Sequence, residues 1–152
     1  MKFTKLLPNS CNFRDLIDNN RVYVDKTALI CQIAKDEKGP YFISRPRRFG
    51  KSTLINTFHE LFAHGTERFK GLEIEPLWKD KTYKVIHLDF STFREVPSNS
   101  SFNKEFMDAF KLSLEEAGIE PTKENIDSPA NLLKKTLDTE SEVVLLVDEY
   151  DA

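Results

Sequence analysis

A short run of basic, glycine and hydroxyl residues has the chemistry to hold a phosphate group. It reads RPRRFGKST and covers residues 45–53. Gly50 would let the backbone approach a phosphate closely, Lys51 would reach the β- and γ-phosphates, and the Ser52 hydroxyl could coordinate Mg²⁺. Backbone amides at the start of a helix favour such a ligand. The run therefore predicts a phosphate-binding loop that opens a helix.

This run departs from the standard G-x-x-x-x-G-K-[ST] pattern because Arg45 stands in place of the first glycine. A basic surface turn that caps a helix is the alternative interpretation. Arg47 and Arg48 are unusual inside such a loop. They could add charge-assisted contacts to a phosphate or an acidic partner. Solvated side chains, or side chains paired with local acids, are an equal alternative.

A second motif is an apolar run that ends in two acids, VVLLVDE over residues 143–149. At the carboxyl end of a parallel strand, Asp148 would hold Mg²⁺ through water, and Glu149 would polarise the attacking water as a general base. The motif is uninformative alone but specific together with Gly50-Lys51-Ser52. It favours ATPases with a strand-end glutamate over GTPase-like proteins. Asp89, which ends another expected strand, is a weaker candidate at the same edge.

The elements that must position these residues can be read from hydrophobic periodicity and from turn residues. Apolar runs without alternation predict strands that are covered on both faces, in a parallel sheet flanked by helices. The fold class is therefore α/β. The expected elements are a helix from Asp25 to Ala34, a strand at 41–44, a helix from Lys51 to Gly65, a strand at 85–90, a helix capped by Ser100 or Ser101, a helix from Ser128-Pro129 and a strand at 142–147.

Composition excludes several classes of function. The formal net charge is −3, which gives no overall attraction to nucleic acid or anionic membranes. The longest aliphatic run, 143–147, is too short to span a bilayer, and no signal peptide is evident, so we expect a cytoplasmic protein. Cys11 and Cys31 form no metal or disulfide pattern. DNA binding through Arg45, Arg47, Arg48 and Lys51 stays an alternative.

Three strings then point to a known family. YVDKT at 23–27, FISRPRRFGKS at 42–52 and LVDEYD at 146–151 resemble the AAA-ATPase-like family of bacterial proteins, whose members carry these motifs in this order. The resemblance spans nearly the whole chain and makes the missing first glycine a family trait. It implies an ATP site, with Mg²⁺, formed by Gly50, Lys51, Ser52 and Thr53; Arg47, Arg48 and Phe49 are further candidates for the same site. Lys51 and Glu149 would be catalytic, and Ser52 and Asp148 would hold the metal.

The resemblance also implies a fold and a domain plan. We expect a P-loop NTPase three-layer sandwich with a parallel sheet, truncated after the acidic-motif strand. Residues 1–38 would be an N-terminal extension and 39–152 an incomplete nucleotide-binding core. In this branch a later strand lies between the phosphate-loop strand and the acidic strand, so we expect a gap in the sheet or a partner chain that fills it.

The expected function is ATP binding with Mg²⁺-dependent hydrolysis, and the 152-residue piece alone is expected to be inactive. The first alternative is a nucleotide-dependent switch or assembly module with little turnover, and the second is a DNA-associated module. A small-molecule kinase is disfavoured because the sequence shows no lid. Full-length members of the family often carry a C-terminal PD-(D/E)XK nuclease-like domain, and a homo-oligomer is a further open alternative.

Overall fold

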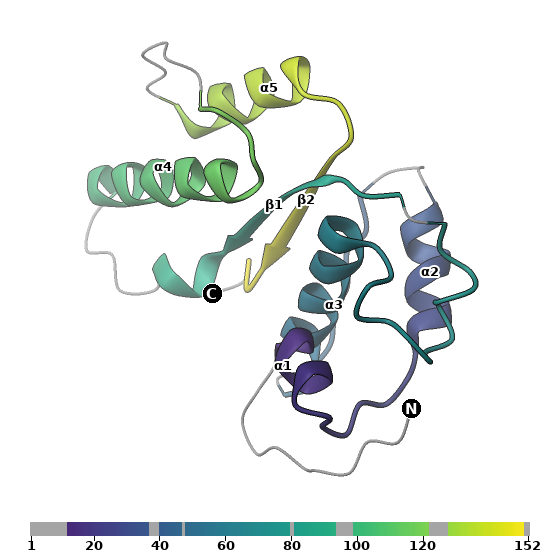
Figure 1. Cartoon of the computed structure of the whole chain (residues 1–152). Helices are drawn as coiled ribbons and strands as arrows, with labels where there is room; N and C mark the ends of the chain where they lie inside the picture. Colours follow the sequence, from purple (N-terminus) through teal and green to yellow (C-terminus); the bar gives the residue numbers. More distant parts are fainter. Residues whose placement is uncertain are drawn as a thin grey trace. The chain divides into compact units, whose positions relative to one another are not determined.

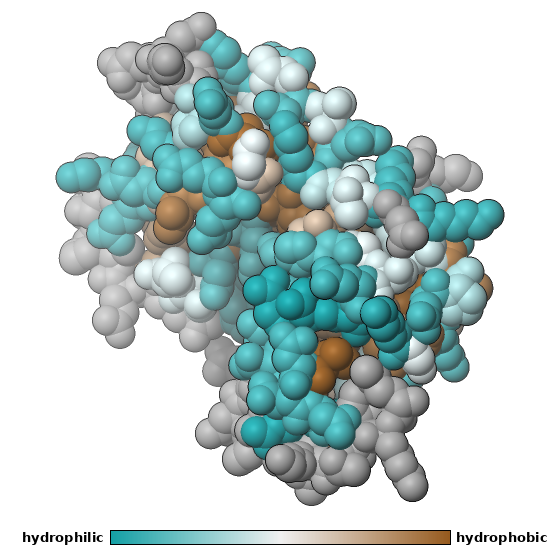
Figure 2. All heavy atoms as spheres, viewed as in Figure 1, coloured by the Kyte–Doolittle hydropathy of each residue, from teal (hydrophilic) through white to brown (hydrophobic). Residues whose placement is uncertain are grey.

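The computed structural model describes residues 12–36, 40–46, 48–79, 81–93, 99–121 and 128–150. The chain divides into two compact units, Met1–Thr82 and Tyr83–Ala152. Hydrophilic residues cover most of the face seen in Figure 2, with apolar residues exposed between them. In the described ranges, no helix is both long and apolar enough to cross a bilayer.

The described part of the first unit contains the helices α1 (Phe13–Asp18), α2 (Thr27–Lys35) and α3 (Lys51–His64) (Figure 1). The expected helix from Lys51 is confirmed, and Gly65 ends it with a φ of 64°. Its buried apolar positions, Phe58, Leu61 and Phe62, follow the spacing of one helical face. The aromatic ring of Phe13 stacks on Phe69 with ring centroids 4.7 Å apart, which joins α1 to the turns that follow α3.

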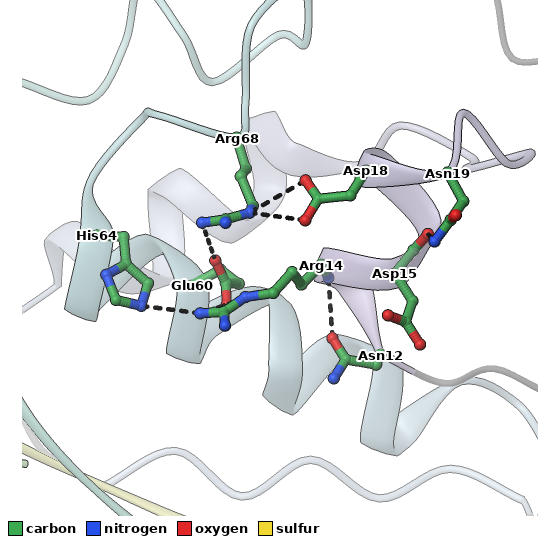
Figure 3. Close-up of polar contacts among 8 residues, drawn as sticks. All are labelled: Asn12, Arg14, Asp15, Asp18, Asn19, Glu60, His64 and Arg68. Carbon is green, nitrogen blue, oxygen red and sulfur yellow. Dashed lines mark hydrogen bonds and ion pairs between the residues drawn. The ribbon is translucent and has the colours of Figure 1, made fainter. Parts of the chain in front are cut away.

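A buried carboxylate ties α1 to α3 (Figure 3). Glu60 of α3 is only 5% exposed. Its Oε1 accepts from Arg14 Nε at 3.0 Å, and its Oε2 lies 3.3 Å from Arg68 Nη1. Arg68 also donates to Asp18 at the end of α1, and Arg14 Nη2 lies 3.2 Å from His64 Nε2. Two arginines from different segments therefore balance one buried charge.

Asp25 lies just before the Lys26 N-cap of α2 and bonds both to the first helical residue and to a distant turn. Its Oδ1 accepts from the backbone N and the Oγ1 of Thr27, at 2.9 and 2.7 Å, and its Oδ2 accepts from Glu73 N at 2.9 Å. Burial alone would raise the pKa of Asp25, but these hydrogen bonds outweigh it and hold the pKa below its ordinary value. Thr27 Oγ1 in turn accepts from Ile74 N at 3.1 Å. The predicted cap is therefore not formed as expected, because Lys26 occupies the N-cap position and makes no side-chain cap hydrogen bond, but Asp25 and Thr27 fasten the start of α2 to residues 73–74.

The second unit contains a parallel pair of strands. They are β1 (Lys84–Asp89) and β2 (Val143–Asp148), in register from Lys84 opposite Val143 to Asp89 opposite Asp148. Between them run the short 3₁₀ helix η1 (Phe90–Phe93), α4 (Asn99–Glu116) and α5 (Pro129–Thr139), with α4 packed on β1 and α5 on α4. The buried core of this unit comprises Ile86, Leu88, Met107, Phe110, Leu114, Ile119 and Leu132.

Several sequence expectations need correction. Residues 41–44 form no strand, and Phe42 is 66% exposed, because an apolar run becomes a strand only when another strand accepts its hydrogen bonds. In the described part of the chain, the one sheet is β1–β2. α4 already includes Ser100 and Ser101, so neither residue caps it.

The sheet is also less covered than expected. Leu145 and Val147 of β2 are exposed, whereas Leu146 and Asp148 are buried. The prediction that both faces are covered is therefore wrong for β2. The helix α4 packs on β1. Within the described ranges, β2 pairs with β1 alone. Cys11, Arg47 and Asp151 lie outside the described residues.

We predict that Glu60→Gln lowers the free energy of unfolding by about 1–3 kcal/mol. The substitution keeps the shape of the side chain but leaves Arg14 and Arg68 without the negative charge between them, and Arg14 is partly solvated, which limits the loss. Urea unfolding measures the change. Glu115→Gln, at an exposed position of α4, is the control and should stay within about 0.5 kcal/mol of the unsubstituted chain. Equal effects for the two variants would contradict a structural role for the Glu60 cluster.

Candidate functional site

The phosphate-binding loop predicted from sequence lies directly before α3. Gly50 precedes the first helical residue and has a φ of 75° and a ψ of 27°. A Cβ atom at Gly50 would meet nothing within 4 Å, so glycine is favoured by the left-handed backbone and not by lack of space. Arg48 is also left-handed, with a φ of 65°, which is uncommon for a residue with a side chain. The backbone therefore turns twice in the left-handed region, on either side of Phe49.

The first turns of α3 are well fixed by hydrogen bonds. Gly50 O accepts from Leu54 N at 3.0 Å, Ser52 O accepts from Asn56 Nδ2 at 2.8 Å, and Thr53 O accepts from Thr57 Oγ1 at 2.7 Å. The first N–H groups of an α-helix have no acceptor within the helix, and the helix dipole adds positive potential there. The N-cap residue Gly50 has no side chain with which to cap these amides. This end of α3 therefore suits an anion.

The sequence-predicted residues differ in exposure. Arg48, Phe49 and Gly50 are exposed, whereas Lys51, Ser52 and Thr53 are partly buried at the start of α3. Arg45 is exposed as well. A ligand at the helix start would thus meet exposed backbone first and the Lys51 and Ser52 side chains next to it.

A cavity of about 500 Å³ opens beside the loop, entirely within the first unit. Gly50 and Thr53 form part of its wall, together with residues 22–24 and one side of α2. Most of the other lining side chains are aliphatic. The helix start therefore adjoins a pocket of the size that small-molecule ligands occupy, about 300–1,000 Å³.

Tyr23 is a residue whose contact with α3 the sequence did not reveal. Its side chain is hydrogen-bonded to that of Thr57 in the second turn of α3, and its ring meets Phe13 edge-on at 5.1 Å. Burial raises the pKa of Tyr23, the bond to Thr57 lowers it in part, and the charge of Asp25 raises it again. Only the YVDKT string hinted at this position, and nothing in its spacing indicated a contact with α3.

The acidic motif lies at the carboxyl end of β2. Asp148 is buried, and its Oδ1 accepts from Glu149 N at 2.9 Å. Glu149 is left-handed with a φ of 52°, so the chain turns sharply as the strand ends. Asp89 of β1 stands opposite Asp148 in the parallel register. The expectation that Asp89 ends its strand at the same edge is confirmed.

The structure groups the predicted residues into two sets. Residues 48–53 lie together in the first unit, and Asp89, Asp148 and Glu149 lie together in the second. In the described parts of both units, no group of three or more His, Cys, Asp or Glu side chains is arranged to hold a metal ion.

Comparisons with known proteins agree with the motifs. A family model described as "Predicted AAA-ATPase" (AAA-ATPase-like) matches residues 10–152. The chain is also 34% identical, over 133 residues, to an "Uncharacterized protein in vnfD 5'region" of Azotobacter chroococcum mcd 1. That match covers 85% of this chain and 25% of the relative, so the chain spans about a quarter of the relative's length. No solved structure matches the chain.

We predict that Gly50→Ala and Gly118→Ala each destabilise the chain by about 1–2 kcal/mol, since both residues are left-handed, with φ of 75° and 70°, and neither Cβ would clash. Only Gly50→Ala should weaken binding of tripolyphosphate, by about tenfold, because only Gly50 directs the amides at the start of α3. Urea unfolding and calorimetric titration measure the two effects. If both variants bound tripolyphosphate as the unsubstituted chain does, the loop would not be an anion site.

Proposed function

The chain belongs to the AAA-ATPase-like family, and from this premise we propose that it binds ATP with Mg²⁺ at the loop before α3 and supports ATP hydrolysis. The observation that carries the proposal is the left-handed Gly50 at the start of a 14-residue helix, followed directly by Lys51 and Ser52. This arrangement supplies amides, a helix dipole, a cation and a hydroxyl to one phosphate chain.

Each residue of the loop has a proposed task. The amides of residues 50–53 would hold the β-phosphate, and the Lys51 ammonium would neutralise charge on the β- and γ-phosphates. The Ser52 hydroxyl would face the magnesium ion. Arg48 and Phe49 are exposed beside the same helix start, and Arg47 belongs to the same run of sequence. All three are proposed to line the phosphate site.

The acidic strand end would complete the reaction chemistry. Asp148 would bind the magnesium ion through water, and Glu149 would accept a proton from the attacking water. The bound magnesium ion would withdraw charge from the transferring phosphoryl group. Because Asp148 Oδ1 accepts from Glu149 N, the Asp148 carboxylate helps to fix the turn in which Glu149 lies.

The finer features of the family are proposals for this chain. They include the complete three-layer P-loop sandwich, in which a strand not described here would pair with the free side of β2. The chain spans only 25% of its relative, so a C-terminal nuclease-like domain, a homo-oligomer and a nucleic acid partner also stay predictions. So does the cytoplasmic location. A steep salt dependence of DNA binding would favour the DNA-associated alternative.

We predict that Lys51→Ala weakens ATP–Mg²⁺ binding by about 10- to 100-fold, the usual effect of removing a hydrogen bond to a charged group. Isothermal titration calorimetry on the chain measures the affinity. Lys104→Ala removes an exposed lysine of α4 and should leave the affinity unchanged. If Lys51→Ala binds as tightly as the control, or if the unsubstituted chain does not bind, the basic surface turn becomes the better interpretation.

We further predict that Glu149→Gln retains ATP binding within about threefold but lowers the rate of phosphate release at least tenfold, because general-base catalysis contributes at least about two orders of magnitude. A coupled phosphate assay in the full-length protein measures turnover, and the Glu105→Gln variant, at an exposed position of α4, is the control. Turnover unaffected by Glu149→Gln would remove Glu149 from the reaction. It would then favour a switch with incidental hydrolysis.

A further inference from the structure

Aliphatic side chains at the edge of the cavity beside the loop are unusually exposed. Val24 is 70% exposed and Leu29 is 58% exposed, and both line the cavity. Val22 is exposed and lines it as well. Exposed apolar side chains that cluster at one cavity often mark a ligand-binding site, whereas single exposed apolar side chains are normal on a protein surface.

The core of the unit does not use these side chains. The buried residues of α2 are Thr27, Ile30 and Cys31, whereas Leu29 is exposed. Val24 precedes the helix, next to Asp25. Asp25 and Thr27 bond to residues 73–74. These bonds hold the backbone that carries Val24 and Leu29, so the exposed aliphatic side of the cavity is fixed before a ligand binds.

The cavity is continuous with the phosphate loop. Arg45, Gly50 and Thr53 belong to the loop region and also line the cavity. A nucleotide whose phosphates lie at the start of α3 must place its sugar and base within one nucleotide length of that point. The cavity of about 500 Å³ lies within this reach and is large enough for them.

We propose that the base of the bound nucleotide occupies this cavity, with its ring packed against Val24 and Leu29. The inference rests on the proposed function. It gives the YVDKT segment a second role: besides attaching α2 to residues 73–74, it forms a wall of the base pocket. Lys26 and Gln32 are polar side chains in the same lining. Of these two, the amide of Gln32 offers a donor and an acceptor together, which matches the edge of adenine.

The test compares two ligands that share their phosphates. ATP and inorganic tripolyphosphate are titrated separately into the chain, into Leu29→Gln and into Leu112→Gln. Leu112 of α4 is 55% exposed and lies outside the cavity lining, so it matches Leu29 in exposure. We expect Leu29→Gln to weaken ATP binding five- to tenfold and to leave tripolyphosphate binding unchanged, while Leu112→Gln alters neither.

Circular dichroism confirms that each variant is folded. Val24→Thr, a change that keeps the side-chain shape, is a second test, and we expect it also to weaken ATP binding while tripolyphosphate binding stays unchanged. If ATP binds the unsubstituted chain no more tightly than tripolyphosphate, or if Leu29→Gln weakens both ligands equally, the base pocket is wrong and the phosphate site stands. If neither ligand binds the unsubstituted chain, the proposed function fails, and the base pocket fails with it.

Discussion

The first unit depends on one buried charge. Glu60 lies in the middle of α3, and its carboxylate would be costly to bury without the arginines that face it. Arg14 comes from α1 and Arg68 from the turns after α3, so the need to balance one carboxylate brings three segments together. The same helix begins at Lys51 with the phosphate loop. The Glu60 cluster thus fixes the element that presents the proposed ATP site.

A second constraint acts on the same helix through the segment before α2. Asp25 holds the start of α2 and residues 73–74, and Tyr23 reaches Thr57 on α3. Thr57 in turn donates to Thr53 O in the first turn of the helix. The segment before α2 therefore contacts the helix that carries the loop, and it also forms a wall of the adjoining cavity. This dual placement gives a physical reason for a motif that looks like a simple helix cap in the sequence.

Local signals predicted much of this arrangement. The spacing of Phe58, Leu61 and Phe62 predicted α3, and Gly50 and Gly65 marked its ends. Long-range effects were not predictable. Glu60 looks like any polar helical residue, because its partner Arg14 is 46 positions away. Residues 41–44 have the composition of a strand, yet pairing decides whether a strand forms, and the sequence does not name the partner.

The strand ends also combine a local signal with a long-range effect. The apolar run before Asp148 predicted β2. The pairing of Asp148 with Asp89, however, depends on the register of two strands that are separated in sequence by α4 and α5. The left-handed backbone at Arg48 and Glu149 was likewise invisible, because glycine is the usual signal for it. Arg48 and Glu149 belong to the two motifs, whereas Asn20 and Glu142, which are also left-handed, lie outside them.

The central claim is that the start of α3 holds the phosphates of ATP. Its most direct test is a titration of the ¹⁵N-labelled chain with ATP–Mg²⁺, followed by amide chemical shifts. If ATP binds there, the largest shifts occur at the amides of Gly50, Lys51, Ser52 and Thr53. Shifts confined to other segments at saturating ATP, with these four amides unmoved, would contradict it.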